Sequence, residues 1–402
     1  MKRIVLLLVL FSISFPSWAD DDPYEPPSWI GVWKGKVGKQ PVTACLENDC
    51  GGSICGAYYY DKHLNIIRLK PAEEHPQGKK LPTFLEDISN PSKTPKSMWK
   101  LSQPNEDTLV WTWSTKDKKY PINLRRADDI DKAQVRFPMD DDYDRACGSD
   151  AFNNARELRP HVASSIGTIH DTPYRILSVD FEKIFAAEVT SFKLLGTDQN
   201  SMRINGQIRN ELREELKLAL GCIRSSLNLW GEEGEVLSTK KPLWISHHWV
   251  IAETDFNGFC SGPYPPKNVG HETWNLQTGK RENLWLWFNS SGARVIHNNL
   301  ATPDAYDEVM IGPKLRQELI RGWLRNKPDK DCADIGRTED GWEVWPNERG
   351  LAFTPSLPNA AFACADDVVV PFEKILPMLN AKGQAAVAAL RADFARLGLH
   401  KI

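Results

Sequence analysis

Two carboxylates close together in the sequence, Glu253 and Asp255, have the residue type and position that hydrolytic chemistry would need. They flank the end of a predicted strand, just before the loop that holds Cys260, and strand ends commonly carry functional groups. Glycosidases use a pair of carboxylates, although the pair is defined by its separation in space rather than in sequence. Glu253 and Asp255 are therefore the catalytic candidates for a hydrolase acting on carbohydrate.

The neighbouring histidines His247 and His248 fall in a predicted strand over residues 243–254. Successive side chains on a strand point to opposite faces, so these two cannot bind one metal ion together. His247 shares its face with apolar neighbours, which predicts a hydrogen-bonded histidine in or beside the core. The acidic run at residues 139–144 lacks the central glycine and final glutamate of a calcium loop. The sequence predicts no metal and no cofactor.

Aromatic residues are the candidates for a binding surface, because the chain contains 15 tryptophans. Trp111 and Trp113 alternate along a predicted strand, and Tyr58 and Tyr60 share a face of another. Such rings can stack on sugars. Aromatic side chains that alternate on a strand more often fill the core of a small β domain. We favour the core for Trp111, Trp113, Tyr58 and Tyr60 and keep a glycan-binding surface as the alternative.

The chain contains 8 cysteines: Cys45, Cys50, Cys55, Cys147, Cys222, Cys260, Cys332 and Cys364. An even number favours disulfides, and the absence of a CxxC pair argues against zinc. The second four are predicted to pair as Cys222 with Cys260 and Cys332 with Cys364. In the first four, Cys45 could pair with Cys55 across a hairpin, or Cys50 could pair with Cys55 and leave Cys45 for Cys147.

The N-terminus has the pattern of a secretion signal, with two basic residues, a short apolar run from Ile4 to Phe15 and small residues at Ser17 and Ala19. Cleavage after Ala19 would move the formal charge from −3 to −5, because residues 1–19 hold two basic residues and no acidic one. This mildly acidic balance argues against a nucleic-acid partner. We expect a periplasmic or secreted protein with no membrane span after cleavage.

The remaining chain reads as two domains of an α+β protein. Residues 20–126 predict a small antiparallel β sheet or barrel, with the Pro-, Lys- and Glu-rich stretch 71–96 as an exposed loop. Residues 127–164 read as a linker or a long excursion. Residues 165–402 predict helices on a mostly antiparallel sheet, since apolar residues recur at helical spacing around Ile204 to Ile223, after Pro313 and from Val387 onward.

Two stretches of the second domain resemble a known family. The run from Asp255 to Pro265, DFNGFCSGPYP, followed by WNLQTGK from Trp274, is similar to a turn and strand of the RsiV-like extracytoplasmic domain. The stretches GLAF from Gly350 and VVVPF from Val368 are similar to the closing strands of that family. The resemblance covers residues 172–379. The first domain, with its Trp-x-Gly-x-Val-Gly opening, resembles small β domains of other exported bacterial proteins.

The resemblance implies an α+β fold of the kind found outside the membrane in lysozyme-sensing anti-sigma factors, and it implies no catalytic residues. Family members usually have Ala-His where this chain has Pro263-Tyr264, so no role of that histidine carries over. We therefore expect a non-catalytic envelope protein that binds a lysozyme-like enzyme or cell-wall glycan. The alternatives are an envelope carbohydrate hydrolase, which would use the carboxylate pair, and a structural or stress-protective protein.

Overall fold

The computed structural model describes residues 29–47, 54–72, 83–87, 97–104, 107–127, 146–157, 160–181, 184, 186–230, 232–260, 267–296, 308–326, 331, 332, 334 and 341–399. The predicted signal segment, the acidic run at 139–144 and Cys50 lie outside these residues. The described residues combine helices with antiparallel sheets, so the α+β class is confirmed.

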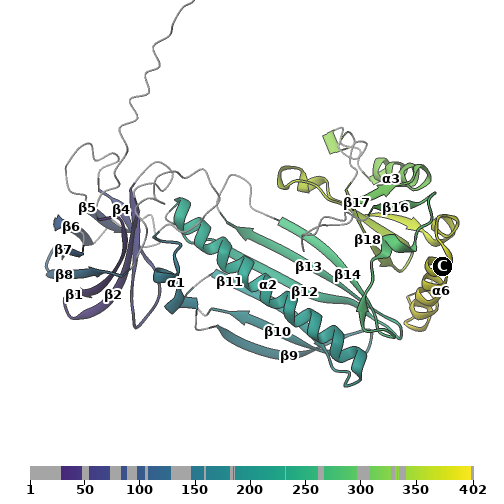
Figure 1. The fold of residues 1–402 in the computed structure, drawn as a ribbon, viewed down its shortest axis with the longest axis horizontal. Coiled ribbons are helices and arrows are strands. Elements are labelled where there is room, and N and C mark those ends of the chain that lie inside the picture. The colour runs from purple at the N-terminus through teal and green to yellow at the C-terminus, as the bar shows by residue number, and fades with distance from the viewer. Residues whose placement is uncertain are drawn as a thin grey trace, which may run out of the picture.

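The N-terminal domain is a closed eight-stranded barrel with its strands in sequence order (Figure 1). Its strands are β1 (Gly31–Val37), β2 (Gln40–Glu47), β3 (Cys55–Tyr60), β4 (Ile67–Pro71), β5 (Thr83–Asp87), β6 (Ser97–Pro104), β7 (Thr108–Thr115) and β8 (Lys119–Arg126). The barrel closes where β1 pairs with β8. Gly35 is required at this seam, because a Cβ there would lie 2.0 Å from the carbonyl oxygen of Asn123. The stretch predicted as a loop contains β5.

The segment predicted as a linker contains helix α1 (Asp150–Glu157) and the start of strand β9 (His161–Ile169). Apolar side chains make this part a packed joint rather than a simple connection. Phe152 of α1, Tyr59 of the barrel and Leu227 of the second domain are buried in one cluster. A disulfide between Cys45 and Cys147 fixes the joint to β2.

A twisted seven-stranded sheet forms the centre of the second domain, in the order β15-β14-β13-β12-β11-β10-β9. The remaining strands are β10 (Thr172–Asp180), β11 (Ala186–Leu194), β12 (Glu235–Ile245), β13 (Trp249–Phe259), β14 (Lys267–Asn275) and β15 (Lys280–Arg281). β11 and β12 are parallel, and the other neighbours are antiparallel. Helix α2 (Gln199–Trp230) connects the parallel pair and crosses in front of the sheet (Figure 1).

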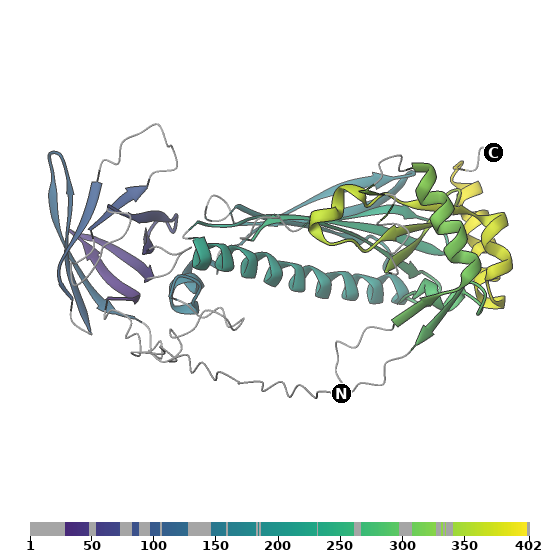
Figure 2. The ribbon, with the colours of Figure 1, turned by 90° about the horizontal axis from the view of Figure 1, so that it is seen from above.

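The largest hydrophobic cluster lies at the far end from the barrel, where small sheets and helices cover the end of the large sheet (Figure 2). These elements are η2 (Leu284–Trp287), β16 (Ala293–Ile296), β17 (Glu308–Ile311), α3 (Pro313–Asn326), β18 (Trp342–Asn347), β19 (Gly350–Pro355), η3 (Asn359–Cys364), β20 (Val368–Pro371), α5 (Phe372–Ile375), η4 (Leu376–Met378) and α6 (Ala381–Arg396). The predicted starts of α3 at Pro313 and of β20 at Val368 agree with the structure.

Two disulfides stabilise the second domain, and they join Cys222 to Cys260 and Cys332 to Cys364, as the sequence predicts. In the barrel domain the bond between Cys45 and Cys147 excludes the alternative pairing of Cys45 with Cys55. Cys55 is also disulfide-bonded. None of the helices among the described residues is long and apolar enough to cross a membrane.

One predicted strand is wrong. Residues 243–254 form two strands, because β12 ends at Ile245 and β13 begins at Trp249. The turn between them is held by Ser246, whose backbone N–H donates to the carbonyl of Trp249 at 2.8 Å. His247 is therefore exposed at a hairpin turn rather than beside the core. The sequence missed this three-residue turn because Ser246, His247 and His248 include no glycine or proline, the residues that usually indicate a turn.

A candidate binding groove along the long helix

Helix α2 positions the candidate site, because its 32 residues span about 48 Å along one face of the sheet. The helix is straight and amphipathic: Ile204, Ile208, Ile223 and Leu227 are all buried. Its start is capped by Asp198, whose carboxylate accepts hydrogen bonds from the backbone of Asn200 and Ser201 at 3.0 Å. A long helix fixed at this end provides a rigid wall for a site.

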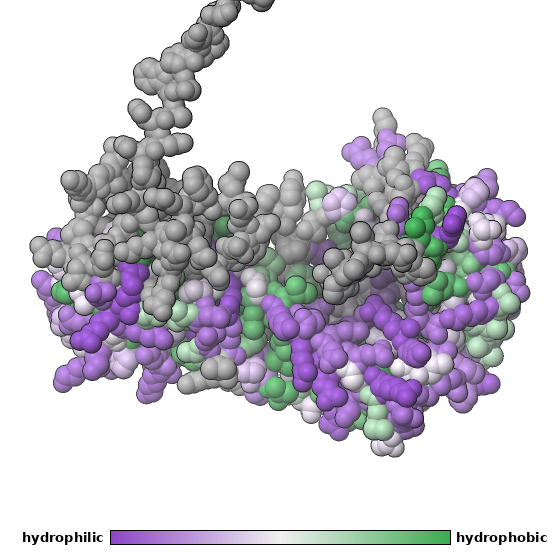
Figure 3. All heavy atoms as spheres, viewed as in Figure 1, coloured by the Kyte–Doolittle hydropathy of each residue, from purple (hydrophilic) through white to green (hydrophobic). Residues whose placement is uncertain are grey.

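A groove of 1140 Å³ runs between the C-terminal half of α2 and strands β13 and β14, and we call it the α2 groove. Its walls carry apolar side chains that are exposed, since Leu218 is 62% exposed and Leu229 is 37% exposed. Phe256 and the Cys222–Cys260 disulfide lie on its sheet side. Figure 3 shows apolar residues gathered at the middle of this face, surrounded by polar ones.

The floor of the α2 groove contains a charge cluster that is already neutralised. The buried ammonium of Lys240 lies 2.8 Å from Glu211 of α2 and 2.5 Å from Glu272 of β14. Arg281 adds a second cation, 2.9 Å from Glu272. Because these charges satisfy one another, they join the helix to the sheet rather than offer a free charge to a ligand.

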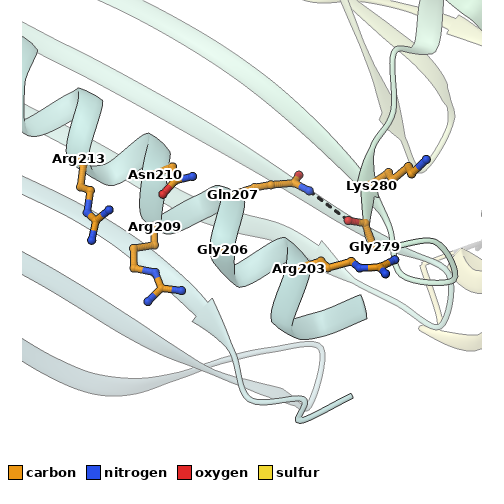
Figure 4. Close-up of a pocket in the computed structure, with 8 residues that line it drawn as sticks. All are labelled: Arg203, Gly206, Gln207, Arg209, Asn210, Arg213, Gly279 and Lys280. Atoms are coloured by element: carbon orange, nitrogen blue, oxygen red, sulfur yellow. Dashed lines mark hydrogen bonds between the residues drawn. The ribbon is translucent and has the colours of Figure 1, made fainter. Parts of the chain in front are cut away.

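A second, more open hollow of 890 Å³ lies over Gly206 on the N-terminal half of α2, and we call it the Gly206 hollow (Figure 4). It shares Asn210 with the α2 groove, so the two hollows adjoin along the helix. Gln207 joins the helix to the neighbouring turn by donating to the carbonyl of Gly279 at 3.1 Å. Gly279 has a φ of +68°, a conformation that favours glycine.

The catalytic candidates lie on the face of the sheet opposite α2. Glu253 of β13 is directly opposite His271 of β14 in the register, and the nearest carboxylate oxygen is 3.7 Å from Nε2 of His271. Lys241 of β12 approaches the same carboxylate at 3.0 Å. Asp255 lies two residues farther along β13 and is exposed. Lys241 of β12, Glu253 of β13 and His271 of β14 thus form a row across three neighbouring strands. Asp255 is not part of this row.

His271 is enclosed by a second sheet. Its ring stacks on Trp345 of β18 with centroids 4.1 Å apart, and its Nδ1 lies 3.4 Å from the carboxylate of Glu343. Burial alone would lower the pKa of His271, but its contacts with the carboxylates of Glu253 and Glu343 raise the pKa to about 9. The contact with His271 lowers the pKa of Glu253 to about 2, although burial opposes the shift. At neutral pH the pair is therefore an imidazolium and a carboxylate.

This ion pair predicts a pH dependence of stability. The pKa of His271 rises from 6.5 to about 9 on folding, so its contribution is fully present below pH 6.5 and is lost as the pH rises through 9. We expect the difference in free energy of unfolding between the native protein and a His271→Gln variant to shrink between pH 6.5 and 9. Urea unfolding across that range measures it. His247→Gln, at the exposed turn, is the control and should change stability little at any pH; a constant difference for His271→Gln would contradict the prediction.

The aromatic candidates are part of the barrel interior. Trp111 and Tyr58 are each 1% exposed, so they cannot form a binding surface. Trp113 and Tyr60 pack against the same cluster and are only partly buried. Trp111 and Tyr58 therefore lie in the core, as the sequence favoured, and Trp113 and Tyr60 pack against its edge.

The barrel interior also holds a carboxylate that the sequence did not single out. Glu86 of β5 accepts hydrogen bonds from Tyr58 at 2.5 Å, Trp99 at 3.0 Å and Trp113 at 2.7 Å, and from the hydroxyl of Ser97. Burial and the neighbouring carboxylate raise the pKa of Tyr58. Glu86 lies in the stretch predicted as a loop, so only its spacing of two residues from Phe84, which places both side chains on one face of a strand, could have marked it.

No protein-family model and no curated protein matches the sequence. Among solved structures, a DUF3298 family protein from Pseudomonas aeruginosa PAO1 is similar over 56% of this chain and 94% of its own, with 13% identity and a TM-score of 0.33. A member of the same family from Bacteroides fragilis is similar over 58% of this chain and 96% of its own, with 10% identity and a TM-score of 0.37. No group of three or more metal-ligating side chains occurs among the residues that the structure describes.

Proposed function

We propose that this chain is a non-catalytic binding protein of the cell envelope, and that a protein partner occupies the α2 groove. The observation that carries the proposal is the groove itself, an open hollow of 1140 Å³ whose walls combine exposed leucines with satisfied charges. Exposed apolar side chains in a concave surface mark sites of interaction with other molecules. The predicted signal segment and the disulfides support an exported location.

The groove favours a protein over a glycan. Glycan sites present flat aromatic rings on which sugars stack, but among the described residues that line the groove Phe256 is the only Phe, Tyr or Trp. The groove instead offers Leu218 and Leu229, which are the kind of side chain that packs into a protein interface. The aromatic candidates for sugar stacking are buried in the barrel core, as Trp111 and Tyr58 are, or packed against it, as Trp113 and Tyr60 are.

The chemistry of the acidic candidates supports binding over hydrolysis. A glycosidase needs one carboxylic acid that holds a proton near neutral pH. Glu253 is ionised down to a pKa of about 2, and its charge is matched by Lys241 and His271. The envelope carbohydrate hydrolase with Glu253 and Asp255 remains the alternative, and the experiment below separates it from binding.

A lysozyme-like enzyme is the partner that we propose to test first. The run from Asp255 to Pro265, which resembles the RsiV-like domain, supplies Phe256 and Cys260 to the wall of the α2 groove. Part of the segment with the family resemblance therefore forms a wall of the groove. The proposal places the partner's contact at Leu218 and Leu229, on the facing wall.

The test measures dye release from labelled peptidoglycan sacculi, with the mature protein alone and with added lysozyme. We expect no release by the protein alone and reduced release by lysozyme in its presence. A Leu218→Glu/Leu229→Glu variant should lose the inhibition, because two charges would enter the apolar wall. A Met310→Glu/Leu324→Glu variant, which changes two exposed apolar residues of β17 and α3, should retain it.

Each other outcome contradicts the proposal in a different way. Release by the protein alone would make it a hydrolase. Binding to sacculi in a pull-down, with an equal effect of both variants, would indicate a glycan ligand outside the groove. Unchanged lysozyme activity would exclude this partner.

A further inference from the structure

The Gly206 hollow is surrounded by positive charge. Arg203, Arg209 and Arg213 of α2 and Lys280 of β15 line it, and none of the described lining residues is acidic. Among the described residues, none of these four cations has a carboxylate within 4.0 Å. The neighbouring Arg281, by contrast, is paired with Glu272 at 2.9 Å. Four unpaired cations around one hollow are unexpected in a chain whose formal charge is −3.

The placement of these cations costs helix stability. Arg209 and Arg213 are four residues apart, and like charges at that spacing destabilise a helix by about 0.2–0.5 kcal/mol. A ligand that binds both guanidinium groups would offset this cost.

The shape of the hollow leaves the cations accessible. Gly206 forms its floor, and a Cβ there would meet nothing within 4 Å, so the helix backbone is open to a ligand. Figure 4 shows Arg209 and Arg213 projecting to one side of Gly206, with Arg203 and Lys280 at the other end. From Arg203 to Arg213 the cations cover about 15 Å of helix, a length that suits a chain with repeated charges.

We propose that the Gly206 hollow binds the phosphate groups of an anionic polymer. Guanidinium groups match phosphate oxygens in pairs, and three of the four cations are arginines. None of the eight described residues that line the hollow has an apolar side chain. A protein interface depends on buried apolar or aromatic anchors, so this lining favours a phosphorylated polymer over an acidic protein segment.

The inference names a second ligand, beside the partner proposed for the α2 groove, and does not depend on that partner. The test is the affinity of the full mature chain for fluorescently labelled long-chain inorganic polyphosphate, measured by anisotropy at 50 and 200 mM salt. We expect binding that weakens steeply with salt and that falls about tenfold in an Arg209→Gln/Arg213→Gln variant.

The matched control is Lys314→Gln/Arg325→Gln, which removes the same charge from exposed positions of α3 and should bind as the native protein does. Equal losses in both variants would show attraction by overall charge alone and would overturn the proposal. Tighter binding of polyglutamate than of polyphosphate would identify an acidic protein segment instead. The lysozyme test depends on Leu218 and Leu229, and the polyphosphate test depends on Arg209 and Arg213. A chain that fails to bind polyphosphate can therefore still inhibit lysozyme, and a chain that fails to inhibit lysozyme can still bind polyphosphate.

Discussion

Replacing Arg156 with leucine is expected to destabilise the protein by about 3–5 kcal/mol, because it removes a fully buried cation and leaves its partly buried acid, Glu233, unpaired. Arg156 is fully buried at the joint between the barrel and the second domain. Its guanidinium donates to the carbonyls of Leu64 at 2.9 Å and Ile184 at 3.1 Å, and it is paired with Glu233. Burial raises the pKa of Glu233 even with this partner present. From α1, this one side chain thus connects a barrel loop with the segment between β10 and β11 and with the residues just before β12.

Urea unfolding followed by tryptophan fluorescence measures this effect. The double variant Arg156→Leu/Glu233→Leu should recover part of the lost stability, since no unpaired charge then remains in the joint. Arg321→Leu, which removes an exposed arginine paired with Glu318 on α3, is the control and should cost less than about 1 kcal/mol. Equal effects of Arg156→Leu and Arg321→Leu would show that the joint does not depend on this residue.

A Glu86→Leu variant is expected to lose on the order of 3 kcal/mol or more, because several donors in the barrel interior would lose their common acceptor. Each buried donor without a partner costs about 1–3 kcal/mol, and the Nε1 groups of Trp99 and Trp113 both point at this carboxylate. Thermal unfolding, with the fluorescence of the barrel tryptophans as the signal, measures the loss.

Glu86→Gln should be less harmful than Glu86→Leu, because the amide oxygen can still accept a hydrogen bond. Asp117→Asn, on the exposed hairpin between β7 and β8, is the matched control in the same domain and should leave the melting temperature nearly unchanged. A Glu86→Leu barrel as stable as the native one would mean that the aromatic packing alone holds the interior.

The fold was predictable where the sequence pattern is local. The amphipathic run around Ile204 to Ile223 predicts α2, and Pro313 predicts the start of α3, because both signals lie within a single element. The hairpin at His247 was missed for the opposite reason. Ile245 and Trp249 flank the turn four residues apart, so the alternation of apolar residues that is typical of a strand continues through it.

The candidate site was only partly predictable, because its geometry depends on pairing between distant strands. Glu253 stands out in the sequence by its position, but its opposition to His271 depends on the register of β13 and β14. The α2 groove combines Leu218 with Phe256, and no sequence pattern relates these two residues. Glu86 was missed because its short strand is embedded in a polar, proline-rich stretch that resembles a loop.

The disulfide between Cys45 and Cys147 has a consequence for what a protease can release from the protein. It joins residues 102 positions apart, so most of the barrel lies within a covalent ring. A single cut in the backbone between these two cysteines opens the ring but releases no fragment. The barrel and the helix-bearing domain therefore remain one molecule after such a cut, and only reduction in addition to cleavage separates them.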